Sequence, residues 1–287
     1  MTQALTTVEL GSLRLRGRSL GGLYTGFHVS ELDALFDAGT AIRTGSTAKR
    51  LFLSHGHMDH LGALPSLLGM RGLMGGGDKI LEVYCPAEVA DQIPKALDAF
   101  GEIHRFPLKV KLCPMNPGDE LKLRQDLWVR AFRTHHPVPS LGYLFFRRVQ
   151  KLRAEFKTLP GSEIGRRRRA GEDLFDVAEH ALLAYATDTL PEVLDNTPEL
   201  LTVENLVLEC TFLDDRKSVA SARKGCHIHL DELLSYCDRL QNKRIVLMHF
   251  SQLYHPDEVV RILDARCPPA FKARMIPFVP EGTAWWD

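Results

Sequence analysis

The chain has no surplus of charge of either sign. Across 287 residues, 36 lysines and arginines balance 36 aspartates and glutamates, so the formal net charge at pH 7 is zero. This balance argues against a protein that binds nucleic acid over its whole surface, but it leaves room for a local basic patch. A basic patch that binds a charged partner would therefore have to lie in a single segment of the chain.

The sequence also lacks paired cysteines, a secretory leader and long apolar runs. Its six cysteines are scattered and none belongs to a Cys-x-x-Cys pair, so we expect reduced, mostly buried thiols rather than disulfides or thiolate metal sites. The first residues have neither the basic start nor the apolar stretch of a signal peptide. No segment is long enough to span a bilayer. We therefore expect a cytoplasmic protein without a membrane partner.

What remains is the composition of an ordinary globular chain, with 45% hydrophobic and 25% charged residues. Such a chain can form a substantial core, and its length suits a single domain over residues 1–287. Strand-like segments come first and are then mixed with helical ones, twice over. This order predicts an α/β protein with two sheets packed face to face and helices outside. One of the helices is expected over residues 86–100, beginning at a proline.

One short motif carries most of the chemical information. A predicted buried strand over residues 49–54 leads directly into His55-Gly56-His57-Met58-Asp59-His60. A loop that leaves a strand can turn alternate side chains into one pocket, and imidazole and carboxylate groups suit zinc and similar ions. The alternative is a solvated histidine-rich turn. Four potential ligands within six residues instead predict parts of two adjacent metal sites.

Further candidate ligands stand where other predicted strands end. Polar groups at such positions are expected in a site that is built on the edge of a sheet. Taken singly, each is as well explained by a structural histidine or a capping aspartate. Together with the first motif they predict the remaining metal ligands. The candidates are His135 or His136 after the strand over 127–134, Asp188 after 182–187, and His249 at the end of 244–249.

With these motifs in place, the sequence resembles the ribonuclease Z family, the zinc-dependent endonucleases that trim tRNA 3′ ends, in its short form. The first of the matching stretches is common to the wider metallo-β-lactamase superfamily, whereas the last four, in their order and spacing, are more specific. The stretches are LFLSHGHMDHLGALP (51–65), FRTHHPVPSLGY (132–143), LRAEFKTLPGSEI (152–164), YATDT (185–189), LVLECTFLDD (206–215), CHIHLDEL (226–233) and IVLMHFSQLY (245–254).

The resemblance implies a fold, an activity and partners. The fold is the metallo-β-lactamase αββα sandwich, in which two mixed β-sheets are flanked by helices. The activity is two-metal hydrolysis that removes 3′ trailers from precursor tRNA. It uses two Zn²⁺ per chain, with Mn²⁺ or another divalent ion as the alternative. The family also works as homodimers, in which the arm of one subunit helps the site of the other.

The resemblance further assigns roles to residues. His136 is preferred to His135 because the family places glycine-tyrosine six residues after the ligand, a spacing that this sequence keeps. The implied first metal site is His55, His57 and His136, and the second is Asp59, His60 and His249, with Asp188 bridging the two. The implied proton-handling residues are Asp59, Glu209 and His227, with His229 as the alternative to His227.

A strongly basic segment interrupts the second half of the chain. Residues 147–169 hold nine lysines and arginines against two glutamates. A charge run is usually a solvated face. The family, however, carries a protruding arm here that grips tRNA, so we predict an inserted arm over about 147–180, poor in strand formers. Its phosphate-binding candidates are Arg166, Arg167, Arg168 and Arg169. The alternative function is hydrolysis of a small substrate on the same fold, a cyclic nucleotide or a thioester, which would leave these arginines without a task.

Overall fold

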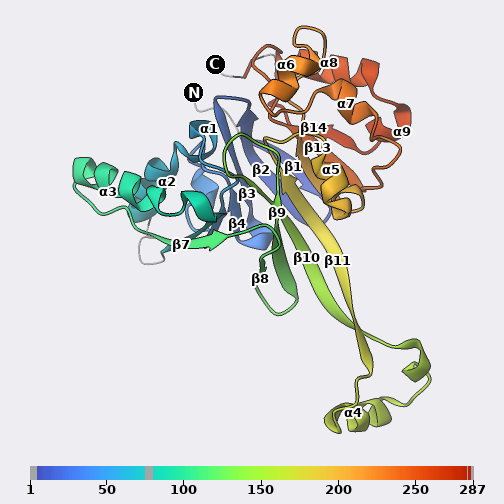
Figure 1. Cartoon of the computed structure of the whole chain (residues 1–287). Coiled ribbons are helices and arrows are strands. Elements are labelled where there is room, and N and C mark those ends of the chain that lie inside the picture. The colour runs from blue at the N-terminus through green and yellow to red at the C-terminus, as the bar shows by residue number, and fades with distance from the viewer. Residues whose placement is uncertain (1–4, 75–79, 283, 286–287) are drawn as a thin grey trace.

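The computed structural model describes residues 5–74, 80–282 and 284–285. Two seven-stranded sheets face each other, with helices on both outer sides (Figure 1). In the first sheet, neighbouring strands are antiparallel from β1 to β4 and parallel from β4 to β7. Its order is β1 (Thr6–Leu10), β2 (Leu13–Leu20), β3 (Tyr24–Val29), β4 (Ala34–Phe36), β5 (Arg50–Phe52), β6 (Leu81–Pro86) and β7 (Val110–Met115).

The second sheet is also mixed. Strands β11 to β14 run parallel to one another, and β8 to β11 are antiparallel neighbours. Its order is β14 (Met275–Pro277), β13 (Arg244–Met248), β12 (Asn205–Glu209), β11 (Phe175–Ala186), β10 (Leu141–Leu152), β9 (Leu127–Arg133) and β8 (Glu120–Lys122). The predicted αββα sandwich is thus confirmed.

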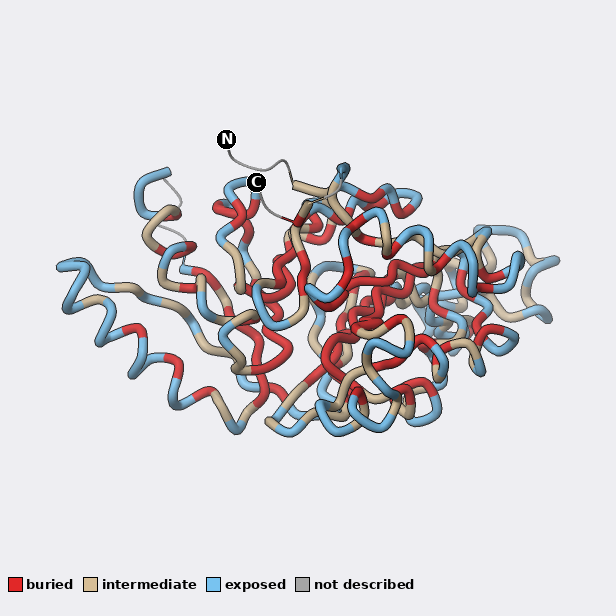
Figure 2. The backbone as a smooth tube through the Cα atoms, turned by 90° about the horizontal axis from the view of Figure 1, so that it is seen from above, coloured by how far each residue is buried: buried red, intermediate tan, exposed pale blue. Residues whose placement is uncertain are grey.

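Helices cover the outer face of each sheet and bury its apolar side chains. Figure 2 shows that buried segments of the chain gather inside the molecule, with exposed segments around them. On the first sheet lie α1 (Met58–Leu61), α2 (Leu64–Leu73) and α3 (Gln92–His104). On the second lie α5 (Val193–Asn196), α6 (Val219–Lys224), α7 (Leu230–Leu234), α8 (Pro256–Arg266) and α9 (Pro269–Lys272). No helix in these described ranges has the length and apolar character of a membrane span.

The core between the sheets follows from the pattern of the strands. In β2, leucines alternate with arginines, and burial alternates with them, as expected for a strand with one face inward. Strand β12 is buried at every position because helices cover its second face. Aromatic rings meet between the sheets, with Phe36 against Phe145 at 5.4 Å and Phe52 against Tyr143 at 5.1 Å between ring centroids.

The helix predicted over residues 86–100 is wrong at its start. Pro86 ends β6 in an extended conformation, a single 3₁₀ turn follows at Ala87–Val89, and α3 begins only at Gln92. A second proline, Pro94, lies in the first turn of α3. Backbone N–H groups in that turn have no acceptor within the helix, so the N–H that proline lacks costs no hydrogen bond. The helix therefore begins beside this second proline and not at the first.

The basic segment forms a long two-stranded hairpin. Strand β9 pairs with β10 only as far as the Leu127–Arg147 pair, and β10 then continues with β11 alone, from the Arg148–Glu179 pair to the Leu152–Phe175 pair. The tip carries α4 (Gly161–Arg169) and projects from the sandwich (Figure 1). The arm predicted over about 147–180 thus consists of strand as well as helix, although its composition is poor in strand formers, because both core strands extend into it.

Candidate metal centre and proton-handling pair

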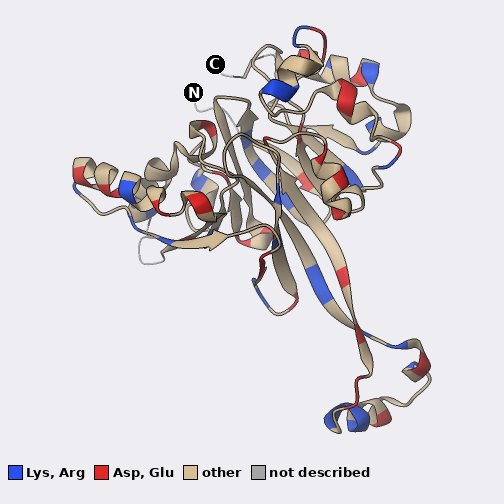
Figure 3. Ribbon diagram, viewed as in Figure 1, with Lys and Arg blue, Asp and Glu red and all other residues tan. Residues whose placement is uncertain are grey.

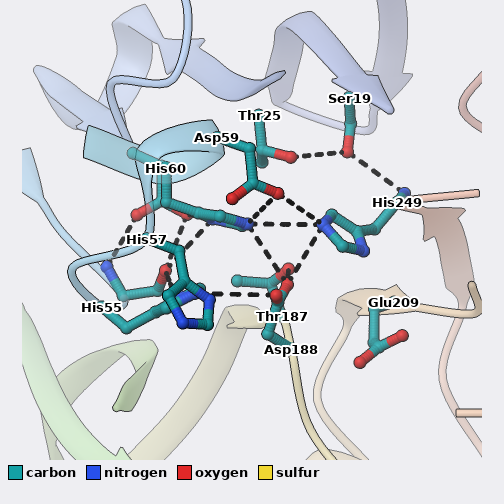
Figure 4. Close-up of polar contacts among 12 residues, drawn as sticks. Ser19, Thr25, His55, His57, Asp59, His60, Thr187, Asp188, Glu209 and His249 are labelled. Carbon is teal, nitrogen blue, oxygen red and sulfur yellow. Dashed lines mark hydrogen bonds and ion pairs between the residues drawn. The ribbon is translucent and has the colours of Figure 1, made fainter. Parts of the chain in front are cut away.

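The candidate ligands lie where strands of both sheets end at one edge of the sandwich (Figure 4). His55, His57, Asp59 and His60 follow β5, His136 follows β9, Asp188 follows β11, and His249 follows β13. The apolar strands thus deliver each polar group to the same edge. No long loop is needed to bring these residues to the site, since the buried part of each strand stops just before its polar residue.

Three strand ends at this edge share an unusual backbone conformation. Asp37, Asp188 and His249 have positive φ angles of 57°, 47° and 62°, in the left-handed region that non-glycine residues seldom adopt. They follow β4, β11 and β13 respectively. A left-handed residue turns the chain sharply away from its strand. All three side chains are nonetheless buried at the site, which indicates that the surrounding structure enforces this conformation.

The first group of ligand atoms comes from His55, His57, His136 and Asp188, and these atoms all lie within 4.8 Å of one another. Oδ2 of Asp188 is 3.6 Å from Nε2 of His55 and 3.8 Å from Nε2 of His136. His136 Nε2 is also 3.1 Å from His57 Nδ1. Three imidazoles and one carboxylate oxygen thus converge on one point.

The second group comes from Asp59, His60, Asp188 and His249. Oδ1 of Asp188 is 3.3 Å from Nε2 of both His60 and His249. Asp59 Oδ2 lies 3.4 Å and 3.5 Å from the same two nitrogens. Asp188 therefore belongs to both groups and turns a different carboxylate oxygen toward each, which is the geometry of a bridging ligand.

The donor set fits divalent cations. Nitrogen and oxygen donors in these numbers suit zinc and similar ions. His55 Nδ1 contacts Ser54 Oγ at 3.0 Å, whereas its buried Nε2 has no hydrogen-bond partner among the residues that the structure describes. Burial lowers the pKa of His55 well below its usual value and that of His136 to about 4, so both rings are neutral and can donate a lone pair.

Charge in the second group is balanced by a proton. Burial disfavours a charged His60, but the carboxylates of Asp188 and Asp37 outweigh it and raise the pKa of His60 well above its usual value. Burial likewise disfavours an ionised Asp188, yet the imidazoles of His249 and His60 hold its pKa well below the usual range. A divalent cation can take the place of that proton, because metal ligands bind in their deprotonated form.

Asp37 orients His60 in the second ligand group through a hydrogen bond. Asp37 was not among the residues predicted from the sequence. It accepts hydrogen bonds from Ser54 N–H at 2.7 Å, Ser54 Oγ at 2.8 Å and Tyr185 O–H at 2.6 Å. Its Oδ2 is also 2.8 Å from His60 Nδ1, which fixes that ring with Nε2 toward the site. The signal was present, since Asp37 follows an apolar strand just as Asp188 does.

A second unit adjoins the ligands. Glu209 is fully buried at the end of β12 and lies 3.1 Å from Nδ1 of His227. It also accepts hydrogen bonds from Thr189 N–H at 2.7 Å and Thr211 O–H at 2.5 Å. Burial lowers the pKa of His227, but the charge and hydrogen bond of Glu209, together with the carboxylates of Asp188 and Asp59, outweigh burial and raise that pKa to about 9. His227 is therefore protonated near neutral pH, and its side chain reaches solvent with 20% exposure.

Thr211 links this unit to the ligands. Because its hydroxyl proton goes to Glu209, its oxygen accepts from Nδ1–H of His249 at 3.1 Å. Nε2 of His249 then points toward Asp188 and lies 3.3 Å from its Oδ1. Thr211 is a functional residue that was not predicted from the sequence, where its one signal is its place two residues after Glu209.

The sequence left two choices, each between a pair of neighbouring histidines. In both pairs the two histidines have different surroundings in the structure. His136 is in the first ligand group, whereas His135 contacts Asn196 Nδ2 through Nε2 at 2.8 Å. His227 faces Glu209, whereas the buried His229 caps α7 by accepting from Asp231 N–H and donating to the carbonyl oxygen of Lys217 at 2.9 Å.

The four arginines of the arm lie on α4, away from this site (Figure 3). Glu163 binds both Arg166 and Arg167, and these hydrogen bonds lower its pKa to about 2. Arg168 donates to Gln150 and lies over the ring of Phe175. Arg168 and Arg169 form no ion pair with an acidic side chain in the described part of the chain, so their charges face solvent unneutralised.

Comparisons with known proteins agree with this geometry. The pattern of the beta-lactamase superfamily domain matches residues 32–250. The chain is 34% identical over 264 residues to tRNase Z TRZ1 of Arabidopsis thaliana, covering 91% of this chain and 94% of that protein. It is 32% identical over 254 residues to the chloroplastic tRNase Z TRZ2 of the same plant, covering 88% and 71%.

Solved structures show the same fold. The metallo-beta-lactamase fold protein YhfI from Bacillus subtilis superposes with a TM-score of 0.61 at 15% identity, covering 97% of this chain and 96% of that one. Human tRNase Z, short form, superposes with a TM-score of 0.51 at 20% identity, covering 77% and 82%. With its match to the superfamily domain and its close sequence relatives, the chain belongs to the ribonuclease Z family of metal-dependent hydrolases.

Proposed function

We propose that this protein is an endoribonuclease that removes 3′ trailers from precursor tRNA by two-metal phosphodiester hydrolysis. The observation that carries the proposal is Asp188, whose two carboxylate oxygens each complete a separate ligand group. The identity to proteins named tRNase Z over most of the chain supports the tRNA substrate.

Each ligand group would hold one ion, preferably Zn²⁺, with Mn²⁺ or another divalent ion as the alternative. Two such ions about 3.5–4 Å apart clamp a phosphodiester and make water a strong nucleophile at neutral pH. The first would be bound by His55, His57 and His136 and the second by Asp59, His60 and His249, with Asp188 between them. Asp59, held ionised beside two imidazoles, would also accept the proton of the attacking water.

His227 would supply the other proton. As water attacks phosphorus, the bond to the 3′ oxygen of the tRNA breaks and its electron pair goes to that oxygen. A protonated His227, oriented by Glu209, can neutralise the leaving oxygen by general-acid catalysis. The products are a tRNA with a 3′ hydroxyl and a trailer with a 5′ phosphate.

The arm would bind the tRNA body, and its direction supports a homodimer. Strands β10 and β11 have their site ends at Leu141 and Ala186 and run away from the site into the arm. Twelve residues at about 3.3 Å each place the start of the tip about 40 Å from that edge. An arm that points away from its own site is better placed to hold tRNA for the site of a partner subunit.

The test compares two substrates and measures bound metal. The purified protein should hold about two transition ions per chain and cleave a precursor tRNA at its 3′ trailer. It should cleave bis(p-nitrophenyl) phosphate far less efficiently, because the small diester lacks the contacts that position the scissile bond. Equal kcat/KM for both substrates would favour the alternative, a small-molecule phosphodiesterase on this fold.

A further inference from the structure

A cavity of about 370 Å³ opens beside the candidate metal centre, on the His136 side. It lies between the end of β6, the turn after β7 and the loop that joins β9 to β10. His136 forms part of its wall, whereas His227 and Glu209 do not. A ligand in this cavity would therefore adjoin the first ligand group without occupying the place of the proton donor.

The walls combine prolines with polar and charged groups, among them the exposed side chains of Arg133 and Glu88. Four prolines line the cavity: Pro86, Pro117, Pro137 and Pro139. Arg133 lines it too, is exposed, and has no ion pair or side-chain hydrogen bond to the other residues in the described ranges. The prolines give the cavity flat apolar faces, and a guanidinium is well suited to bind phosphate in bidentate fashion. The volume is at the low end for small-ligand sites, which suits one nucleotide.

The proposed reaction decides which nucleotide this is. His227 would stand at the leaving 3′ oxygen, so the tRNA end lies on the side of His227. The ring of His136 lies next to that of His227, 5.9 Å away between centroids, and borders the cavity, whereas His227 does not. The other nucleotide of the scissile phosphate then lies beyond His136, toward the cavity. We infer that this cavity binds the first nucleotide of the trailer between its proline walls, with Arg133 holding the phosphate that follows that nucleotide. The inference rests on the proposed function.

The first experiment uses trailer length. A trailer of one nucleotide ends in a free 3′ hydroxyl and has no following phosphate, whereas a trailer of three nucleotides has one. Arg133→Gln should raise KM for the three-nucleotide precursor about fivefold to tenfold, as for loss of one charge-assisted contact, with little change in kcat. For the one-nucleotide precursor it should change neither constant appreciably. The matched control is Lys109→Gln, which removes an exposed charge at the far end of β7 and should affect neither precursor.

The second experiment tests the nucleoside itself with the unmodified protein. A precursor whose first trailer nucleotide is abasic should show a raised KM, because the base can no longer pack against the prolines. Equal losses on both trailer lengths with Arg133→Gln, or an abasic precursor that behaves like the normal one, would overturn the assignment alone. Failure of the unmodified protein to cut either precursor would overturn the proposed function and the assignment with it.

Discussion

At one end of β10 and β11 the side chains are packed among aromatic rings, and at the other end they face solvent. Tyr143 and Tyr185, near the site, are at most 1% exposed, and Asp188 just beyond them is 2% exposed. From residue 147 to residue 173, by contrast, no side chain is buried. The same two strands thus join a dense region that can fix ligand positions to an exposed region that can only offer reach and charge.

The two regions also use charge differently. In the arm, Arg153 pairs with Asp173 and Asp176 at the surface, where an ion pair contributes about 0–1 kcal/mol. At the site, Asp37 and Asp188 are buried, and removing one partner of a buried charged pair costs on the order of 3–5 kcal/mol. Substitutions should therefore have large, all-or-none effects at the site and small, graded effects on the arm.

The largest effect is expected for Asp188→Asn, which keeps a residue type that tolerates the left-handed backbone but removes the charge shared by both ligand groups. Bound metal should fall below one ion per chain, and cleavage should drop at least about a thousandfold, equivalent to several kcal/mol of transition-state stabilisation. Metal analysis and single-turnover rates measure both. Asp195→Asn, a change at an exposed aspartate, is the control; two ions still bound to the Asp188 variant would refute the bridging role.

Next in size is His227→Ala, which should slow cleavage about a hundredfold or more while leaving metal content intact. The pKa of about 9 adds a pH signature, because the donor loses its proton as pH rises through that value. The rate of the unmodified enzyme should therefore fall above about pH 9, and the variant should lack this fall. His229→Ala should lower stability without removing the alkaline fall. If His229→Ala removes it and His227→Ala does not, the assignment is wrong.

A smaller effect is expected at Thr211, where one hydroxyl serves both Glu209 and His249. Thr211→Val removes both hydrogen bonds and should weaken metal binding about tenfold to a hundredfold, the usual range for partners of metal ligands. Thr211→Ser keeps the hydroxyl and should restore most of the affinity. Competition with a chelator at fixed pH measures this. Equal affinities of the valine and serine variants would show that Thr211 acts only by packing.

The smallest effects belong to the arm. Changing Arg166, Arg167, Arg168 and Arg169 together to glutamine should flatten the salt dependence of tRNA binding by about one unit per lost phosphate contact. Cleavage of a small phosphodiester should stay nearly constant. The Arg168/Arg169 pair should account for more of the loss than Arg166/Arg167, because Glu163 already binds the latter two. If the fourfold variant processes limiting precursor tRNA as fast as the parent, the arm is only a solvated surface.

The site was only partly predictable from the sequence, for a physical reason. The ligands after β5 are predictable because four of them fall within six residues. Asp37 and Tyr185 could not be paired in this way, since they are 148 residues apart and meet only when the two sheets face each other. The same holds for Thr211 and His249, whose hydrogen bond joins the ends of two different strands.

The arm shows the other limit of sequence reasoning. Where β10 and β11 leave the sheet, both of their faces meet solvent, so burial imposes no alternation that would identify a strand. The excess of positive charge in residues 147–169 is also partly neutralised by acidic residues that lie outside this segment in the sequence. The returning strand places acidic residues opposite basic ones, with Glu179 facing Arg148 and Asp176 facing Lys151. Of the described residues 147–169, Arg168, Arg169 and Lys157 then remain available to a polyanion.

The left-handed strand ends at Asp37, Asp188 and His249 carry a conformational cost that their buried contacts outweigh. A non-glycine residue in this region costs on the order of 1–3 kcal/mol. Glycine would relieve that strain, but at Asp37 and Asp188 it would also remove one partner of a buried charged pair, which costs on the order of 3–5 kcal/mol. A search for heat-resistant variants would therefore keep both aspartates even if it ignored catalysis. The same buried charges thus serve the fold and the proposed metal centre.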